Sequence, residues 1–359
     1  VSGFRLDVIN LISKTPGLPN DPEGDGRAYY TDGPNVHDYL QEMNAAVFAG
    51  HDLLTVGEMS STSLEHCLQY SSLENQELKM TFNFHHLKVD YPNGEKWTAA
   101  PFDFKQLKQI FSDWQTGMNG QAWNAIFWCN HDQPRVVSRF GDDVAYRVES
   151  AKMLATTLHG LQGTPYIYQG EEIGMPNPDF TNLSDYRDVE TLNAYQEART
   201  NGVSEEAILA AIRQKSRDNA RTPMPWSDAV NGGFSTSEPW IPVSPTYDQI
   251  NVEAAVADPD SVYHHYKRLI QLRKQYDVLT NGSYRLLTPD DPSLWAYERA
   301  TSEEELLVVS NFYGTDTTFT LPHDGSDYTV LLHNYQQMQT EGYTLTLRPY
   351  ESLMLYRKK

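Results

Sequence analysis

Short apolar segments alternate with amphipathic segments through the first half of the chain. Five segments rich in apolar or β-branched residues, each followed by a polar loop, lie at residues 3–10, 53–57, 78–84, 125–129 and 164–169. Between them, apolar residues recur at helical spacing over residues 36–48, 64–70, 104–118 and 146–160. Near-continuous apolar strands that alternate with helices predict an α/β fold with a parallel sheet covered by helices.

The first strand is not followed by the G-x-G-x-x-G turn of a dinucleotide-binding fold, so five strand–helix units favour a (β/α)8 TIM barrel. Residues 170–260 differ, because they are rich in Pro, Asn, Gly and Ser and contain one helical piece near 204–215. A connection this long is usually functional, so we expect it to cover a binding site. A final helix is predicted at 261–276.

The pattern changes again at about residue 277, where short alternating segments are separated by turn residues. They lie at residues 293–300, 305–312, 317–322, 328–334, 344–349 and 352–357. This pattern predicts an antiparallel β-sandwich. We therefore expect two domains, with barrel residues at 1–276 and a β-sandwich domain at 277–359.

Composition excludes several classes of protein. Hydrophobic residues make up 39% of the 359 residues and the net charge is −20, which predicts a globular chain that repels nucleic acid. No apolar run approaches the roughly 20 residues of a membrane helix, so we expect no membrane span. The cysteines, Cys67 and Cys129, lack the spacing of a disulfide framework or zinc site, which fits a reducing, cytoplasmic location.

Three carboxylates stand at or just beyond the carboxyl ends of predicted strands: Asp7, Glu58 and Asp132. Active sites of parallel barrels are built at that edge. Any one of these residues is as readily explained as a helix cap or a solvated side chain. Three of them at one structural position are harder to dismiss, and two carboxylates in one cleft are the minimum set for glycoside hydrolysis.

The neighbouring residues sharpen this hypothesis. Arg5 lies two positions before Asp7 and shares its strand face, so its guanidinium would hold Asp7 ionised, as a nucleophile requires. A less polar setting around Glu58, after Val56 and Gly57, would favour the acid role. His131 adjoins Asp132 in a polar burst after five apolar residues, although a lone His is more often a core residue.

Three segments resemble, in order, motifs of the alpha-amylase family of glycoside hydrolases: GFRLDVI (3–9), TVGEMSS (55–61) and FWCNHDQPR (127–135). The resemblance continues through GTPYIYQGEEIGM (163–175) and SRDNARTPMPW (216–226) into the β-rich tail. It implies a retaining glycosidase without a cofactor or metal, in which Asp7 is the nucleophile, Glu58 the general acid/base and Asp132 the transition-state stabiliser. Arg5 would order the nucleophile, and His131 would bind sugar hydroxyls.

The chain also departs from the family pattern, in which three further strand–helix units and an inserted domain precede the nucleophile strand. Five strands cannot close an eight-stranded barrel. We therefore interpret the chain as the C-terminal part of a longer enzyme, and expect the 359-residue piece alone to be inactive. Arg217, Asp218 and Arg221 are expected to fold the long loop back toward the cleft, with Arg221 on the aglycone side, and Glu171 and Glu172 to anchor that loop.

The QGEEIGM and SRDNARTPMPW stretches resemble the oligo-1,6-glucosidase group, which acts on short α-glucosides. Within FNFHHLKVDYPNGEKW (82–97), siblings usually carry Glu-His in place of His85-His86 and no lysine at Lys88. Imidazole in place of a carboxylate, with Lys88 and Lys96 nearby, suits a phosphate. The expected reaction is hydrolysis of trehalose 6-phosphate to glucose and glucose 6-phosphate, by a monomer that binds this phosphorylated disaccharide.

Three alternatives stay open. Lys88 and Lys96 are also readily explained as ordinary solvated lysines. The enzyme is alternatively an oligo-1,6-glucosidase or dextran glucosidase that acts on short α-1,6-glucosides. A non-catalytic binding relative is the third possibility, but that interpretation expects eroded carboxylates and a membrane segment, whereas all three acids are present.

Overall fold

The computed structural model describes residues 1–17, 19–22 and 24–359, which divide into two compact units. The N-terminal unit consists of residues 1–87, 109–126 and 162–165. The C-terminal unit consists of residues 88–108, 127–161 and 166–359. The two units are interleaved along the sequence, because the chain crosses between them at residues 87, 108, 126, 161 and 165.

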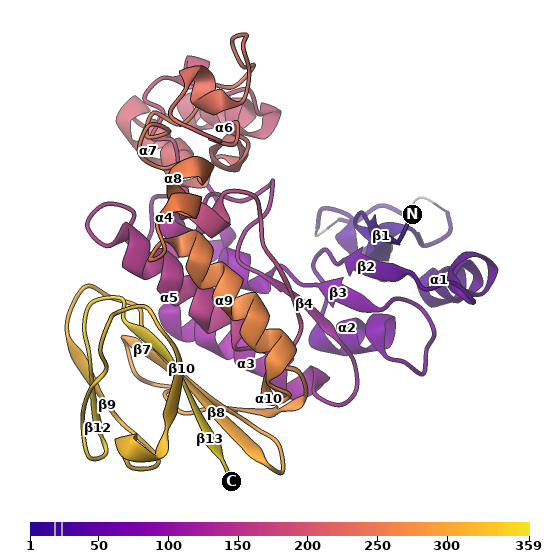
Figure 1. Cartoon of the computed structure of the whole chain (residues 1–359). Coiled ribbons are helices and arrows are strands. Elements are labelled where there is room, and N and C mark those ends of the chain that lie inside the picture. The colour runs from indigo at the N-terminus through magenta and orange to yellow at the C-terminus, as the bar shows by residue number, and fades with distance from the viewer. Residues whose placement is uncertain (18, 23) are drawn as a thin grey trace. The chain divides into compact units, whose positions relative to one another are not determined.

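A five-stranded sheet in the order β1-β2-β3-β4-β5 forms the centre of the N-terminal unit (Figure 1). Its strands are β1 (Gly3–Leu6), β2 (Leu54–Glu58), β3 (Met80–Phe82), β4 (Asn124–Phe127) and β5 (Thr164–Tyr166), the last two ending one residue into the C-terminal unit. Pairing is parallel from β1 through β4. The predicted half-barrel of strands in sequential order is confirmed, with most strands shorter than expected.

Helices α1 (Val36–Met43), α2 (Leu64–Ser71) and α3 (Phe104–Met118) confirm the helical pattern, and α1 continues as a π-helical segment, Asn44–Phe48. Their apolar faces share one core with residues beside the strands: Ile9, Val36, Leu40, Met59, Cys67, Tyr70, Leu78, Trp114 and Met118. Short 3-10 helices occupy connections at Ile9–Leu11, Arg27–Tyr29, His85–Lys88 and Pro92–Gly94. The core therefore lies beneath the segments that leave β1 and β2.

The C-terminal unit contains α4 (Val136–Phe140), α5 (Arg147–His159), α6 (Val189–Thr200), α7 (Glu205–Lys215), α8 (Val252–Ala257), α9 (Val262–Gln275) and α10 (Val278–Asn281). Short 3-10 helices lie at Glu171–Ile173, Leu183–Asp185, Arg217–Ala220, Val230–Gly233 and Gly325–Asp327. The expectation of one helix within 170–260 is wrong. Helix α6 buries only Thr191, so it lacks the apolar stripe that reveals a helix in sequence. Among the described residues, every helix is too short or too polar to span a bilayer.

Two antiparallel sheets form the predicted β-sandwich. One has the order β10-β13-β8-β7-β6 and the other β11-β12-β9. The strands are β6 (Ser283–Leu286), β7 (Leu294–Ala300), β8 (Glu304–Asn311), β9 (Thr317–Thr320), β10 (Thr329–His333), β11 (Gln339–Glu341), β12 (Thr344–Leu347) and β13 (Ser352–Lys358). Side chains from both sheets fill a shared core that includes Leu307, Phe319, Leu345 and Leu355. The domain boundary at 276/277 stays a prediction.

Helix α5 packs against the larger sheet of the sandwich (Figure 1). The hydroxyl of Tyr297 donates to the carbonyl oxygen of Thr157 at 2.7 Å. Arg299 is fully buried, and its guanidinium donates to the carbonyl oxygens of Gly160 at 2.9 Å and Gly282 at 2.7 Å, with longer bonds to two more carbonyls. One buried side chain thus joins the end of α5 to the start of the sandwich.

Replacing Arg299 with Lys keeps the charge but removes the planar fork, which leaves buried carbonyl oxygens without donors. We expect Arg299→Lys to lower the free energy of unfolding by about 2 kcal/mol, measured by denaturant titration. Arg285→Lys, at an exposed ion pair with Glu298 on the same sheet, is the control and should change it by less than about 0.5 kcal/mol. Equal effects of the two substitutions would refute the role given to Arg299.

Candidate active site

The register between β1 and β2 places two of the three candidate carboxylates beside each other in the N-terminal unit. Arg5 lies opposite Val56 and Leu6 opposite Gly57, so Asp7 and Glu58 follow at the next position of each strand. A Cβ at Gly57 would stand 2.5 Å from carbon atoms of Leu78 and Met59, so glycine fits this crowded position before Glu58. The sequence therefore delivers both acids to the carboxyl edge of the sheet.

Arg5 joins the two carboxylates. One guanidinium nitrogen donates to Asp7 and another to Glu58. The side chain of Asp7 is 73% exposed, whereas that of Glu58 is 11% exposed. Burial raises the pKa of Glu58, the charge of Arg5 opposes this, and a hydrogen bond and charge repulsion from Asp7 raise it further. The pair thus consists of an open carboxylate and a sheltered, more readily protonated carboxyl, the division that an acid and a nucleophile require.

The third candidate, Asp132, lies in the C-terminal unit after β4. Its Oδ1 accepts a hydrogen bond from Arg221 at 2.7 Å and a longer one from Arg217 at 3.4 Å, and its Oδ2 lies 3.3 Å from Nε2 of His131. Nε of Arg221 also donates to the carbonyl oxygen of His131 at 2.8 Å. The structure therefore brings together His131, Asp132, Arg217 and Arg221, all of which the sequence singled out, and the roles expected of them stay predictions.

The residues that contact Asp132 form further ion pairs, which the sequence did not reveal. Arg217 bonds to Asp188 at 2.6 Å and to Glu190 at 3.1 Å. Burial alone would raise the pKa of Asp188, but hydrogen bonds from Arg217 and Thr191 hold it below its ordinary value. Nζ of Lys96 lies 2.8 Å from both carboxylate oxygens of Glu190. A continuous chain of ion pairs thus runs from Asp132 through Arg217 and Glu190 to Lys96.

Buried polar groups hold the segment that carries these arginines. The guanidinium of Arg135, 1% exposed, donates to the carbonyl oxygen of Asn219 at 3.2 Å, and the hydroxyl of Tyr168 donates to that of Ala220 at 2.9 Å. Residues 216–221 thus lie against Asp132, and the expectation that they fold back toward the cleft stays a prediction. Glu171 is also a buried anchor, because it accepts a 2.6 Å hydrogen bond from Tyr266 of α9.

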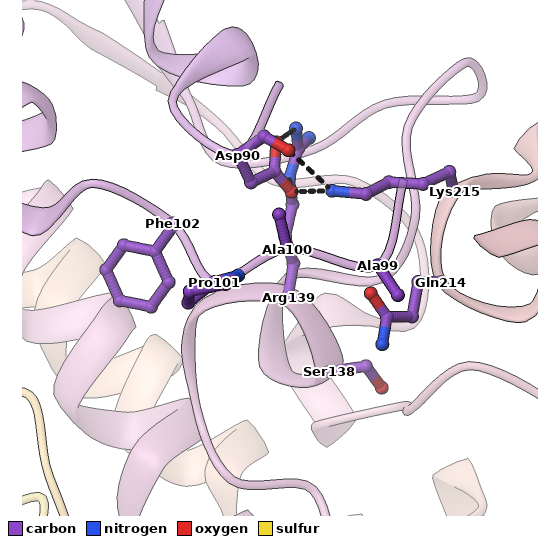
Figure 2. A pocket seen from close by; sticks show the side chains of 9 residues that line it. All are labelled: Asp90, Ala99, Ala100, Pro101, Phe102, Ser138, Arg139, Gln214 and Lys215. Atoms are coloured by element: carbon purple, nitrogen blue, oxygen red, sulfur yellow. Dashed lines mark hydrogen bonds and ion pairs between the residues drawn. The ribbon is translucent and has the colours of Figure 1, made fainter. Parts of the chain in front are cut away.

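Figure 2 shows a buried ionic triad in the wall of a pocket of about 260 Å³. The carboxylate of Asp90 accepts hydrogen bonds from Arg139, at 2.6 and 3.0 Å, and from Lys215, the last residue of α7. Burial would raise the pKa of Asp90, but the two cations hold it below its ordinary value. Since Asp90 follows Lys88 and Lys215 precedes Arg217, the triad connects the 88–97 segment to the arginine-bearing segment.

The candidate phosphate residues lie on the 3-10 helix His85–Lys88 and after it. Nε2 of His85 lies 2.6 Å from the carbonyl oxygen of Thr62, and its ring packs on Trp114. His86 is only 2% exposed and packs on Phe111, an environment that favours a supporting role over a direct phosphate contact. Lys88 is exposed, and Lys96 is largely buried beside Glu190.

The sequence therefore identified most of the charged groups but not how they pair. Asp188 and Glu190 were missed. The only signal for them was the acidic pair in RDVE (187–190), which has no distinguishing spacing. In the part of the chain that the structure describes, no three His, Cys, Asp or Glu side chains are grouped so that they could hold a metal ion.

Comparisons with known proteins agree with this chemistry. The family model described as alpha amylase, catalytic domain, matches residues 1–282, and that of the alpha-amylase SusG C-terminal domain matches 294–354. The chain is 59% identical to trehalose-6-phosphate hydrolase of Bacillus subtilis, covering 99% of this chain and 64% of the relative. It is 50% identical to oligo-1,6-glucosidase of Halalkalibacterium halodurans, covering 98% and 64%.

A solved structure is similar over the same range. The crystal structure of Bacillus licheniformis trehalose-6-phosphate hydrolase matches with a TM-score of 0.96 at 54% identity, covering 100% of this chain and 66% of that one. The chain thus spans slightly less than two thirds of the length of the relatives it matches.

The raised pKa of Glu58 predicts a pH-dependent effect of Glu58→Gln on stability. A folded-state pKa above the unfolded value of 4.5 means that stability present below pH 4.5 is lost as the pH rises through the folded pKa. Removing the ionisable group should therefore raise the thermal midpoint by about 2 °C or more at pH 7, and by less at pH 4.

Glu74→Gln, at an exposed position of the same unit, is the control and should leave both midpoints nearly unchanged. A Glu58→Gln variant that is equally or less stable than the parent at pH 7, with the same difference at pH 4, would contradict the assigned direction.

Proposed function

This chain belongs to the alpha-amylase family of glycoside hydrolases, and on that basis we propose that the protein carrying it is a retaining α-glycosidase that hydrolyses trehalose 6-phosphate to glucose and glucose 6-phosphate. The observation that carries the proposal is the Asp7–Arg5–Glu58 arrangement, an exposed carboxylate and a sheltered carboxyl joined by one guanidinium. A relative with 59% identity bears the name trehalose-6-phosphate hydrolase.

The proposed reaction has two steps. Asp7 attacks the anomeric carbon while Glu58 donates its proton to the departing sugar oxygen, so that glucose 6-phosphate leaves and a covalent glucosyl-enzyme remains. Glu58, now a carboxylate, then takes a proton from water as the water attacks the same carbon. The raised pKa of Glu58 supports the first role, and the ion pair with Arg5 orients Asp7 for the attack.

Asp132 is proposed to stabilise the positive charge that develops on the glucose ring. Its contacts with two arginines and His131 orient the carboxylate. His131 would bind hydroxyl groups of the same sugar, and Arg221 would face the aglycone.

The phosphate is proposed to bind beside Lys88 and Lys96. In a chain of net charge −20, a dianion needs a local group of cations. Lys96 is separated from Asp132 by Glu190 and Arg217, so its ammonium lies within the same charged network as a candidate catalytic group. Lys88, in the same C-terminal unit, is exposed and therefore open to a ligand.

A second candidate function is that of an oligo-1,6-glucosidase. The 50% identity to a relative of that name favours it, since both activities need the same pair of acids. Hydrolysis rates of trehalose 6-phosphate and isomaltose by the full-length protein separate the two candidates. We further propose a monomer that acts in the cytoplasm, and the free thiols of Cys67 and Cys129 support a reducing compartment.

The two acid roles predict different pre-steady-state behaviour with a nitrophenyl α-glucoside, whose leaving group needs no protonation. Glu58→Gln should still release a burst of nitrophenol and then turn over about 100-fold or more slowly, because water lacks its base. Asp7→Asn should give no burst, because no covalent intermediate forms. Stopped-flow absorbance distinguishes these outcomes, and a burst from Asp7→Asn would exclude it as the nucleophile.

Removing a phosphate-binding lysine should affect only the phosphorylated substrate. We expect Lys88→Ala and Lys96→Met each to lower kcat/KM for trehalose 6-phosphate about tenfold or more, and that for isomaltose less than about twofold. Lys274→Ala, at an exposed position of α9 in the same unit, is the control. If both substrates weaken equally, the phosphate assignment is wrong.

A further inference from the structure

Asn10 lies three residues after Asp7, in the 3-10 helix Ile9–Leu11, and is fully buried. Its side-chain amide bonds to both backbone groups of Ser60, which lies two residues after Glu58. Oδ1 accepts from the backbone nitrogen of Ser60 at 3.0 Å, and Nδ2 donates to the carbonyl oxygen of Ser60 at 2.8 Å. A single amide thus joins the two segments that carry the proposed nucleophile and acid.

Further hydrogen bonds fix the orientation of the Asn10 amide. Nδ2 of Asn10 also donates to Oδ1 of Asp32 at 3.2 Å, and the same oxygen accepts a 2.7 Å hydrogen bond from Tyr70. Nδ1 of His66 lies 3.2 Å from Oδ2 of Asp32. Because both polar atoms of the amide are engaged, its orientation is determined and a flipped amide would lose the Ser60 bonds.

The backbone around these bonds is strained. Val8, between Asp7 and Asn10, has a φ of +35°, and Ser61, next to Ser60, has a φ of +55°. A β-branched residue in the left-handed region is a genuine outlier, and such a conformation persists only where its surroundings determine it. The Asn10–Ser60 bonds lie beside both strained residues and are suited to hold them.

We propose that Asn10 is a positioning residue that fixes the separation and aim of the Asp7 and Glu58 side chains by clamping the segment after β1 to the segment after β2. The inference rests on the proposed function, because it assigns Asn10 to the support of that acid pair. Asn10 does not itself contact the substrate in this role. If the Asn10 side chain is removed, Arg5, Asp7 and Glu58 are still present, but the distance between the two acids is no longer fixed.

We expect the removal of the Asn10 amide to lower kcat more than it changes KM. In the full-length protein, Asn10→Ala should lower kcat for a nitrophenyl α-glucoside by about 10- to 100-fold, the cost of a misplacement of about 1 Å, and change KM by less than about threefold. Asn10→Asp should resemble it, because a carboxylate cannot donate to the Ser60 carbonyl and faces Asp32.

The matched control is Asn44→Ala. The side chain of Asn44 also donates to a backbone carbonyl in the same unit, that of Glu77 at 2.9 Å, which lies outside both acid-bearing segments. Assays run well below the thermal midpoints of all variants remove differences in the folded fraction. We expect Asn44→Ala to retain kcat within about twofold. Equal losses of kcat in Asn10→Ala and Asn44→Ala would overturn the proposal.

Amide hydrogen exchange provides a readout that needs no turnover. The Ser60 backbone N–H should lose protection in Asn10→Ala by about 10-fold or more, because its acceptor is gone, and keep it in Asn44→Ala. Unchanged Ser60 protection in Asn10→Ala would also overturn the clamp. If the parent hydrolyses the nitrophenyl glucoside but not trehalose 6-phosphate, the proposed substrate fails while the test of Asn10 stands.

Discussion

The parallel register of β1 against β2 is the constraint on which the candidate site depends. Successive side chains of a strand point to opposite faces, so a slip of one residue would turn Glu58 away from Asp7. With the observed register, Arg5 reaches both carboxylates from a position within the strand itself. The sheet edge therefore brings the two acids next to each other, and the proposed Asn10 clamp on the segments that follow fixes their separation.

In the C-terminal unit, a long segment with little apolar surface has to be held in a fixed position. Residues 170–260 are rich in Pro, Gly, Asn and Ser, and their principal apolar contacts form a small core that includes Phe180, Tyr186, Ile212 and Ile241. Buried charges provide much of the remaining order. Asp188, with a side chain 2% exposed, is compensated by Arg217, because an unpaired buried carboxylate would cost several kcal/mol.

This use of charge also links structure to specificity. Residues 216–221 carry Arg217 and Arg221, and both arginines contact Asp132. The position of this segment and the electrostatic environment of the Asp132 carboxylate are therefore linked. Relatives of this chain bear the names of both phosphorylated-disaccharide and oligosaccharide hydrolases. Since one fold hosts several functions, the choice of substrate depends on individual side chains and not on the fold that these proteins share.

The sequence alone determined the architecture and the acids. Apolar runs followed by polar loops predicted all five strands of the first sheet, and alternation predicted the sandwich, because these patterns reflect burial directly. Asp7, Glu58 and Asp132 were recognisable from their place after strands. Helix α6 was missed because it presents almost no apolar face.

Only the tertiary structure decided which charges pair. Lys96 pairs with Glu190, 94 residues away in the sequence, and Asp132 pairs with Arg217, 85 residues away. No local sequence pattern indicates a partner at such a distance. The same holds for Asn10, whose amide meets Ser60 across two strands. Burial follows from local hydrophobic periodicity, whereas hydrogen bonds between distant polar residues depend on how the chain has already folded.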